Sequence, residues 1–245
     1  MLVSPEYCTG RQLWRLAMPS TLSPADPAWV QGQIGLVTHT GTGLGQVGVA
    51  DGGPTDTYQI TIEILTTGGP GAATFRWRLQ DTDPWSLAVL VPDDGLWPQS
   101  TSVAKRSGFA ESGLALRFTA TALQPFQAGD LYQLPTGESP QQADLRRAVS
   151  DEIERKIKPR GGQPARDWDV GLAELAAQKV AYRLGRIRGF DPRAAHDQQL
   201  LRGEKHANSE LRRIMEEIEQ ADIPGQDTIP GVDCASQPPQ GAELW

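Results

Sequence analysis

Apolar and polar residues alternate in several stretches of the first half of the chain. In residues 58–64 every second position is apolar: Tyr58, Ile60, Ile62 and Ile64. A two-residue period is typical of a strand with one buried face. Residues 74–79 repeat this period, and the glycine-rich stretch 68–71 between the two runs has the chemistry of a turn. The pattern predicts a hairpin.

Two further runs, residues 87–91 and 114–118, are also predicted strands. Asp-Pro, Asp-Asp-Gly and Ser-Gly pairs break the chain between them, as turns between short strands do. The first half of the chain is therefore predicted to be an antiparallel β-sandwich or small barrel.

From residue 139 the period lengthens to that of a helix. Ser139 is a suitable N-cap, Pro140 suits the first helical position, and Gln142 would complete a capping box. Apolar residues then recur every four positions until Pro159: Leu145, Val149, Ile153 and Ile157. This pattern predicts an amphipathic helix with one apolar stripe.

Two more amphipathic helices follow. The first is expected to begin after the cap Asp167 and to end near Gly189, with one apolar face made of Leu172, Leu175, Ala176, Val180, Leu184 and Ile187. The second is expected to open at Asp191-Pro192 and to end near Pro224, with its inward residues being Leu200, Ala207, Leu211, Ile214, Met215 and Ile218. Three such helices predict a small bundle.

Composition divides the chain at the same place. Residues 1–137 are rich in glycine and poor in charge, whereas residues 138–222 hold 16 acidic and 16 basic side chains. Residues 223–245 hold four prolines and no lysine or arginine, which is typical of an extended tail. The sequence thus predicts an α+β fold with three parts: a β-domain (1–137), a three-helix bundle (138–222) and a tail (223–245).

Charge and composition exclude several classes of protein. The chain has 245 residues and a net charge of −7, so it does not coat nucleic acid through an overall basic surface. No apolar run approaches the roughly 20 residues that cross a bilayer. We therefore expect no membrane partner, and we expect the chain to be made in a cytoplasm. The two cysteines, Cys8 and Cys234, are too few for a disulfide framework or a zinc cluster.

No set of residues predicts catalysis, a cofactor or a resident metal. The stretch 41–45 (GTGLG) is glycine-rich like a phosphate loop, but a strand and not a helix is expected after it, so a glycine turn explains it without a ligand. The aspartates of stretches 81–83 and 93–94 lack the spacing of a calcium hand and suit turns. The chain is predicted not to be an enzyme.

Two groups of residues are candidates for contact with partners. Arginines surround the end of the second helix and are candidates either for ion pairs between subunits or for DNA phosphates: Arg183, Arg186, Arg188 and Arg193. The tail offers apolar residues that either anchor in a partner's pocket or belong to a frayed end: Ile229, Val232, Leu244 and Trp245.

The helical part resembles a known family. Residues 143–154 (ADLRRAVSDEIE) and 172–184 (LAELAAQKVAYRL), followed by a long polar helix, are similar to the head-to-tail connector, or adaptor, proteins of tailed phages, especially the Mu-type prophage family. The first part resembles a β-domain of phage virion proteins in its stretches 41–47 (GTGLGQV), 71–77 (GAATFRW), 113–118 (GLALRF) and 126–130 (FQAGD).

This resemblance implies a structural protein of the virion neck, made in the host cytoplasm. Such proteins form a ring, here expected to be a dodecamer, that binds beneath the portal protein and offers its other end to the tail or a tail-terminator protein. Double-stranded DNA passes through the ring. A competing prediction is a virion-surface module that recognises a glycan or host receptor through exposed Trp85 and Trp97 of the β-domain.

Overall fold

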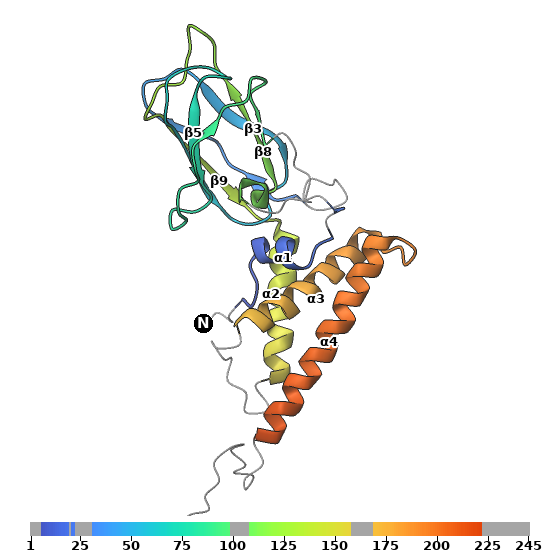
Figure 1. Ribbon diagram of the computed structural model, residues 1–245. Coiled ribbons are helices and arrows are strands. Elements are labelled where there is room, and N and C mark those ends of the chain that lie inside the picture. The colour runs from blue at the N-terminus through green and yellow to red at the C-terminus, as the bar shows by residue number, and fades with distance from the viewer. Residues whose placement is uncertain (1–5, 20, 23–30, 99–107, 158–168, 222–245) are drawn as a thin grey trace, which may run out of the picture.

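The computed structural model describes residues 6–19, 21–22, 31–98, 108–157 and 169–221. The strands, which form two antiparallel sheets, lie before residue 138, and three long helices follow. The predicted α+β class is therefore confirmed. Figure 1 shows the sheets stacked above the helices, with a short helix, α1, between the two parts.

The larger sheet runs in the order β1-β9-β4-β5-β6, and β2 also pairs with β9. Its strands are β1 (Gln33–Ile34), β2 (Thr38–Thr40), β4 (Gln59–Ile64), β5 (Thr74–Arg78), β6 (Val89–Leu90) and β9 (Leu131–Gly137). The predicted hairpin is confirmed, because β4 and β5 pair antiparallel with Ile64 opposite Phe75. The run 87–91 contributes only the two residues of β6, at the sheet edge.

The smaller sheet has the order β3-β8-β7 and faces the larger one. Its strands are β3 (Gln46–Gly52), β7 (Leu96–Trp97) and β8 (Leu114–Thr119), and a 3-10 turn, η2 (Gly108–Ser112), precedes β8. Side chains of both sheets form one buried cluster, in which Phe75 contacts Phe118 with ring centroids 4.6 Å apart. This shared apolar interior is that of a β-sandwich.

The helices are α2 (Pro140–Ile157), α3 (Asp169–Gly189) and α4 (Ala195–Ala221). Most apolar residues that the helical period predicts to be inward are buried, Leu145, Met215 and Ile218 are partly buried, and Ile187 is 52% exposed. The helix α4 begins at Ala195, after a turn at 192–194, and not at Pro192. The predicted cap Asp167 lies outside the described residues.

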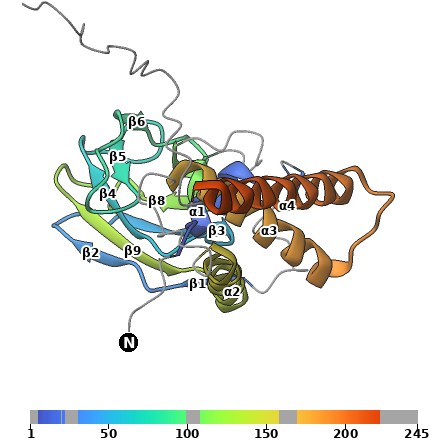
Figure 2. The same ribbon diagram turned by 90° about the horizontal axis from the view of Figure 1, so that it is seen from below.

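Helix α1 (Gly10–Leu16) was not predicted from the sequence. Thr9 caps it, and Gln12 completes a capping box with Thr9. Its apolar side chains, with those of neighbouring residues, belong to the helical core and not to the sandwich: Cys8, Leu13, Trp14, Met18 and Leu22. The N-terminal segment therefore packs with α2–α4, although its composition groups it with residues 1–137. Figure 2 shows α1 between the sheets and α3.

A polar junction joins the sandwich to the helices. Only Glu138 and Ser139 separate β9 from α2. The guanidinium of Arg146, 5% exposed, donates to both carboxylate oxygens of Glu138, and it also donates to Glu6 at 2.8 Å. Burial opposes the charge of Arg146, but the bonds to Glu138 outweigh it and raise the pKa of Arg146.

The predicted capping role of Gln142 is wrong. Its amide donates to the carbonyl oxygen of Thr55, at 2.8 Å, and to Glu138, and its own carbonyl accepts from the indole of Trp14 at 2.9 Å. Gln142 thus links the sandwich, α1 and α2. Gly10 of α1 approaches so closely that a Cβ there would lie 2.2 Å from the oxygen of Thr55. The two parts of the molecule are in direct contact at this junction.

Candidate interaction surfaces

The glycine loop 41–45 encloses the carboxylate of Asp130. Asp130 follows a turn before β9 and is 1% exposed. Its oxygens accept hydrogen bonds from the backbone N–H groups of Thr42, Gly43 and Gln127, at 3.1, 3.0 and 2.8 Å. A Cβ at Gly41 or Gly43 would lie 2.1 or 2.0 Å from a carboxylate oxygen, so both positions require glycine. The loop's amides bind an anion of the chain itself.

Asp130 therefore stays ionised although it is buried. Burial by itself would raise the pKa of this carboxyl group, but the hydrogen bonds from Gln127 and Gly43 outweigh it, and the pKa of Asp130 is lowered. The stretches 41–47 and 126–130, both noted in the sequence analysis, meet here in space. Their pairing is a structural reason for the sequence pattern, and it accords with the interpretation of residues 41–45 as a turn.

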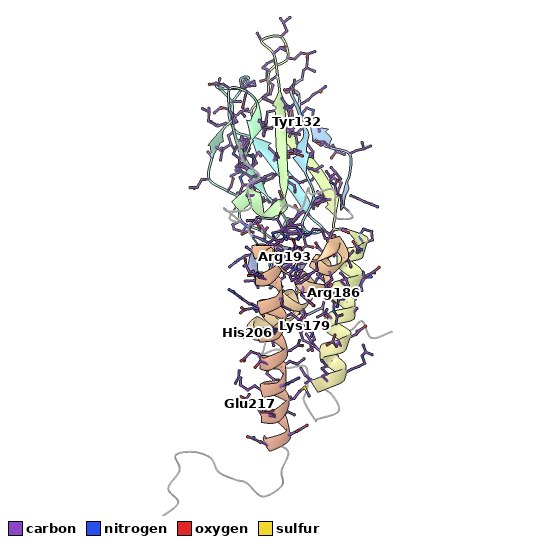
Figure 3. All side chains as sticks on the ribbon, turned by 90° about the vertical axis from the view of Figure 1, so that its right-hand side faces the viewer. Tyr132, Lys179, Arg186, Arg193, His206 and Glu217 are labelled. Atoms are coloured by element: carbon purple, nitrogen blue, oxygen red, sulfur yellow. The ribbon has the colours of Figure 1, made fainter. Side chains whose placement is uncertain are left out.

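A pocket of about 450 Å³ lies beside this loop, between the edge strands β2 and β3. The imidazole of His39 stacks on the ring of Tyr132, with centroids 4.5 Å apart, and its Nε2 lies 3.5 Å from Asp130. The hydroxyl of Tyr132, a residue labelled in Figure 3, donates to the carbonyl oxygen of Gly45 at 2.7 Å. Leu44 borders the pocket and is 62% exposed. The pocket can hold a small ligand or a partner's side chain without covalent chemistry.

The two tryptophans predicted to be exposed are half-buried. Trp97 packs inside an aromatic cluster, with ring centroids 4.7 Å from Phe109 and 5.0 Å from Phe75. The guanidinium groups of Arg76 and Arg78 lie 4.6 and 4.7 Å from the ring centroid of Trp85. Much of the surface of both rings is covered by contacts within the chain. Neither ring is therefore the exposed stacking surface that the glycan hypothesis requires.

The four candidate arginines do not act as one group. Arg183 of α3 pairs with Glu152 of α2, and Arg188 pairs at 2.8 Å with the fully buried Asp197 of α4. Arg186 and Arg193 are exposed and form no ion pair with the described residues. Figure 3 shows Arg193 beside the start of α4 and Arg186 on α3. Two of the four are therefore structural within the subunit.

A buried charge network that sequence analysis missed crosses the three helices. Lys179 of α3 is 2% exposed, and its ammonium group lies 3.3 Å from Glu152 of α2, 3.5 Å from Glu204 of α4 and 2.7 Å from Asn208. Burial would raise the pKa of Glu152, but Lys156, Lys179 and Arg183 outweigh it and lower that pKa to about 2. The sequence held a signal, because Lys179 lies four residues after Leu175 and three after Ala176, in register with the apolar stripe of α3, but it did not show which acids of other helices pair with Lys179.

The junction residues gave a similar signal. Gln142 and Arg146 are four residues apart, and Arg146 lies three residues before Val149, so both lie on the side of α2 that carries the apolar stripe. Polar residues in such a register are buried against a polar partner when the helix packs. The partner here is Glu138, which cannot be identified from the sequence alone.

The predicted partner-binding residues of the tail, Ile229, Val232, Leu244 and Trp245, lie outside the described residues. In the part of the chain that the structure describes, no group of three or more histidine, cysteine, aspartate or glutamate side chains could hold a metal ion. No described helix is long and apolar enough to cross a membrane. No protein-family model, curated protein or solved structure gave a significant match to this chain.

Proposed function

We propose that this chain is a structural protein of the neck of a tailed-phage virion. It is a head-to-tail connector whose ring binds beneath the portal protein, joins it to the tail and lets DNA pass. The resemblance in sequence of both parts to phage proteins motivates this proposal. Its support in the structure is the arrangement of a β-sandwich, a bundle of charged amphipathic helices and a direct junction between them.

The junction is the observation that carries the proposal. A connector must hold two large neighbours at a fixed spacing, so its parts have to be joined without a free hinge. Here a two-residue connection, the ion pair between Arg146 and Glu138, and the bonds of Gln142 tie the sandwich to the helices. Arg11 of α1 adds a backbone bond to Asp56 at 2.8 Å and an ion pair with Glu111. The molecule is thereby suited to act as a spacer.

The tail provides the test. Deleting residues 225–245 is expected to abolish docking to the portal protein, because the anchors Ile229, Val232, Leu244 and Trp245 are removed together. The thermal unfolding of the remaining chain is expected to be unchanged. Co-purification with portal protein and negative-stain imaging measure the docking. A chain with residues 225–245 in scrambled order is the matched control for length and charge, and it is also expected to fail.

A smaller change sharpens the same test. Replacing Leu244 and Trp245 with alanine removes the apolar end of the tail, and replacing Gln240 and Glu243 with alanine is the control at the same end. The first variant is expected to weaken docking about tenfold or more, as loss of an aromatic anchor does, and the second about twofold or less. Docking that survives the full deletion would refute the proposal. Native mass of the docked complex gives the copy number.

A second candidate function is a ligand-binding module of the virion surface. The observation that favours it is the pocket of about 450 Å³ beside His39 and Tyr132, whose border residue Leu44 is 62% exposed. A glycan array probed with the full chain and with a Leu44→Trp variant, which fills the pocket border, tests it. Saturable binding that the variant loses would favour this function over the connector.

A further inference from the structure

The outward face of α4 carries positive charge without partners. Arg202, Lys205 and Arg212 are exposed and form no ion pair or hydrogen bond with the described residues. At about 100° per residue these three positions fall within a sector of about 80°. The buried residues of the helix, Leu200, Ala207, Leu211 and Ile214, lie on the opposite side. We call Arg202, Lys205 and Arg212 the α4 cationic row.

The acidic residues of the first two thirds of α4 do not neutralise this row. Asp197 is buried against Arg188, and Glu204 faces inward to Lys179 and Asn208. Glu210 is half-buried and pairs with Arg213. In this stretch of α4 the acids therefore face inward or pair along the helix, whereas Arg202, Lys205 and Arg212 remain exposed.

The distant negative charge of the molecule acts weakly on the row. At physiological ionic strength charges are screened beyond about 8 Å. The remaining exposed acids of α4, Glu216, Glu217 and Glu219, lie in the last turns, and Figure 3 shows Glu217 well below His206 on the helix. Glu216 is one turn from Arg212 and offsets part of the charge at that end of the row, but it lies about 16 Å along the helix from Lys205 and farther from Arg202. The net charge of −7 thus does not exclude an anionic partner at this face.

The chemistry of the face selects the kind of partner. Protein interfaces have an apolar centre. Among the described residues, none of the exposed large apolar side chains belongs to α4. Arginine and lysine on a polar helix face suit phosphate groups, which need charge and hydrogen-bond donors but no apolar contact. The row extends over ten residues, or about 15 Å, a length over which a DNA duplex presents several phosphates.

We propose that the α4 cationic row contacts the phosphate backbone of double-stranded DNA, without base specificity. The proposal rests on the proposed function, because a connector meets the DNA that passes through it. It places the DNA contact on Arg202, Lys205 and Arg212 and takes it away from Arg183 and Arg188, whose charges are neutralised within the subunit.

The test measures binding of the full chain to a labelled duplex of roughly 30 base pairs by fluorescence anisotropy, between about 50 and 200 mM salt. Wild-type protein is expected to bind, with the affinity falling as salt rises and a log–log slope of about −2 to −3 for three phosphates. The triple variant R202Q/K205Q/R212Q is expected to lose about tenfold or more in affinity at the lowest salt, and its slope moves toward zero.

A matched variant, R15Q/R117Q/R155Q, removes the same charge from exposed positions on α1, β8 and α2. It is expected to bind about as wild type does, within roughly twofold, since those cations do not lie in the row. Circular dichroism checks that both variants are folded. Equal losses in the two variants, or no binding by the wild type at the lowest salt, would overturn the proposal.

Two further outcomes separate the proposals. The wild type could fail to bind DNA and instead self-associate in sedimentation. If the α4 variant then loses this self-association, the α4 cationic row contacts an acidic surface of a second copy, and the DNA proposal is wrong. The α4 variant retains residues 225–245, so it is expected to dock to the portal protein even when it no longer binds DNA. The connector function can therefore stand when the DNA contact falls, and docking can fail while DNA binding remains.

Discussion

The sandwich and the helical part bury different chemistry. In the described residues the sandwich interior is apolar and aromatic and holds one buried charge, Asp130, which backbone N–H groups satisfy. The helical part buries four charged side chains, Arg146, Glu154, Lys179 and Asp197, most of them in pairs between elements. The sandwich is thus stabilised by packing, whereas the helices depend also on ion pairs that pH can disrupt.

The largest expected effect breaks the sandwich side of this comparison. Phe75 is fully buried against Phe118 and Trp97. Replacing it with alanine is expected to lower the free energy of unfolding by about 4 kcal/mol, through lost apolar burial and the cavity left behind. Denaturant titration measures this change. Leu123→Ala, at a position that is 90% exposed, is the control, and a comparable loss there would contradict the assignment of the core.

The next effect concerns the helical network. Lys179→Met keeps the length of the side chain but leaves Glu152 and Glu204 without their shared cation. A loss of about 3 kcal/mol in the free energy of unfolding is expected, because a buried charge loses its partner. Lys205→Met on the exposed face of α4 is the matched control, with an expected change near zero. Equal stability of the two variants would show that the network contributes nothing.

The smallest effect is the response to acid. Glu152 has a pKa of about 2 in the folded chain against the ordinary 4.5, so its stabilisation is complete above pH 4.5 and is lost as the pH falls toward 2. About 2 kcal/mol is expected, allowing for partial exposure of the side chain. Unfolding measured between pH 7 and pH 3 should be less pH-dependent in Glu152→Gln. An unchanged pH dependence would assign the acid response elsewhere, for instance to Asp130, whose pKa is also lowered.

The periodic elements could be predicted from the sequence because burial has a geometric period. Alternation gave the hairpin of β4 and β5, and four-residue spacing gave the core face of α2. The strands β1, β2 and β7 were missed because two or three residues carry no readable period, and β3 because its glycines interrupt the alternation. The strand β9 was also missed, although its buried residues alternate, because Pro135 stands within the run. Helix α1 is only seven residues long, and its apolar contacts are made with α2 and α3 far along the chain.

By itself, the sequence determined the α+β class, the main helices and which of their faces are buried, since these follow from local spacing. Only the tertiary structure decided which charged side chains are neutralised by an ion pair and which remain exposed. Arg183 and Arg188 look like Arg202 and Arg212 in the sequence, but acids of other helices neutralise the first two and leave the others open. An ion pair depends on distances of a few ångströms between remote elements, because electrostatic energy falls with distance and is screened by water and salt.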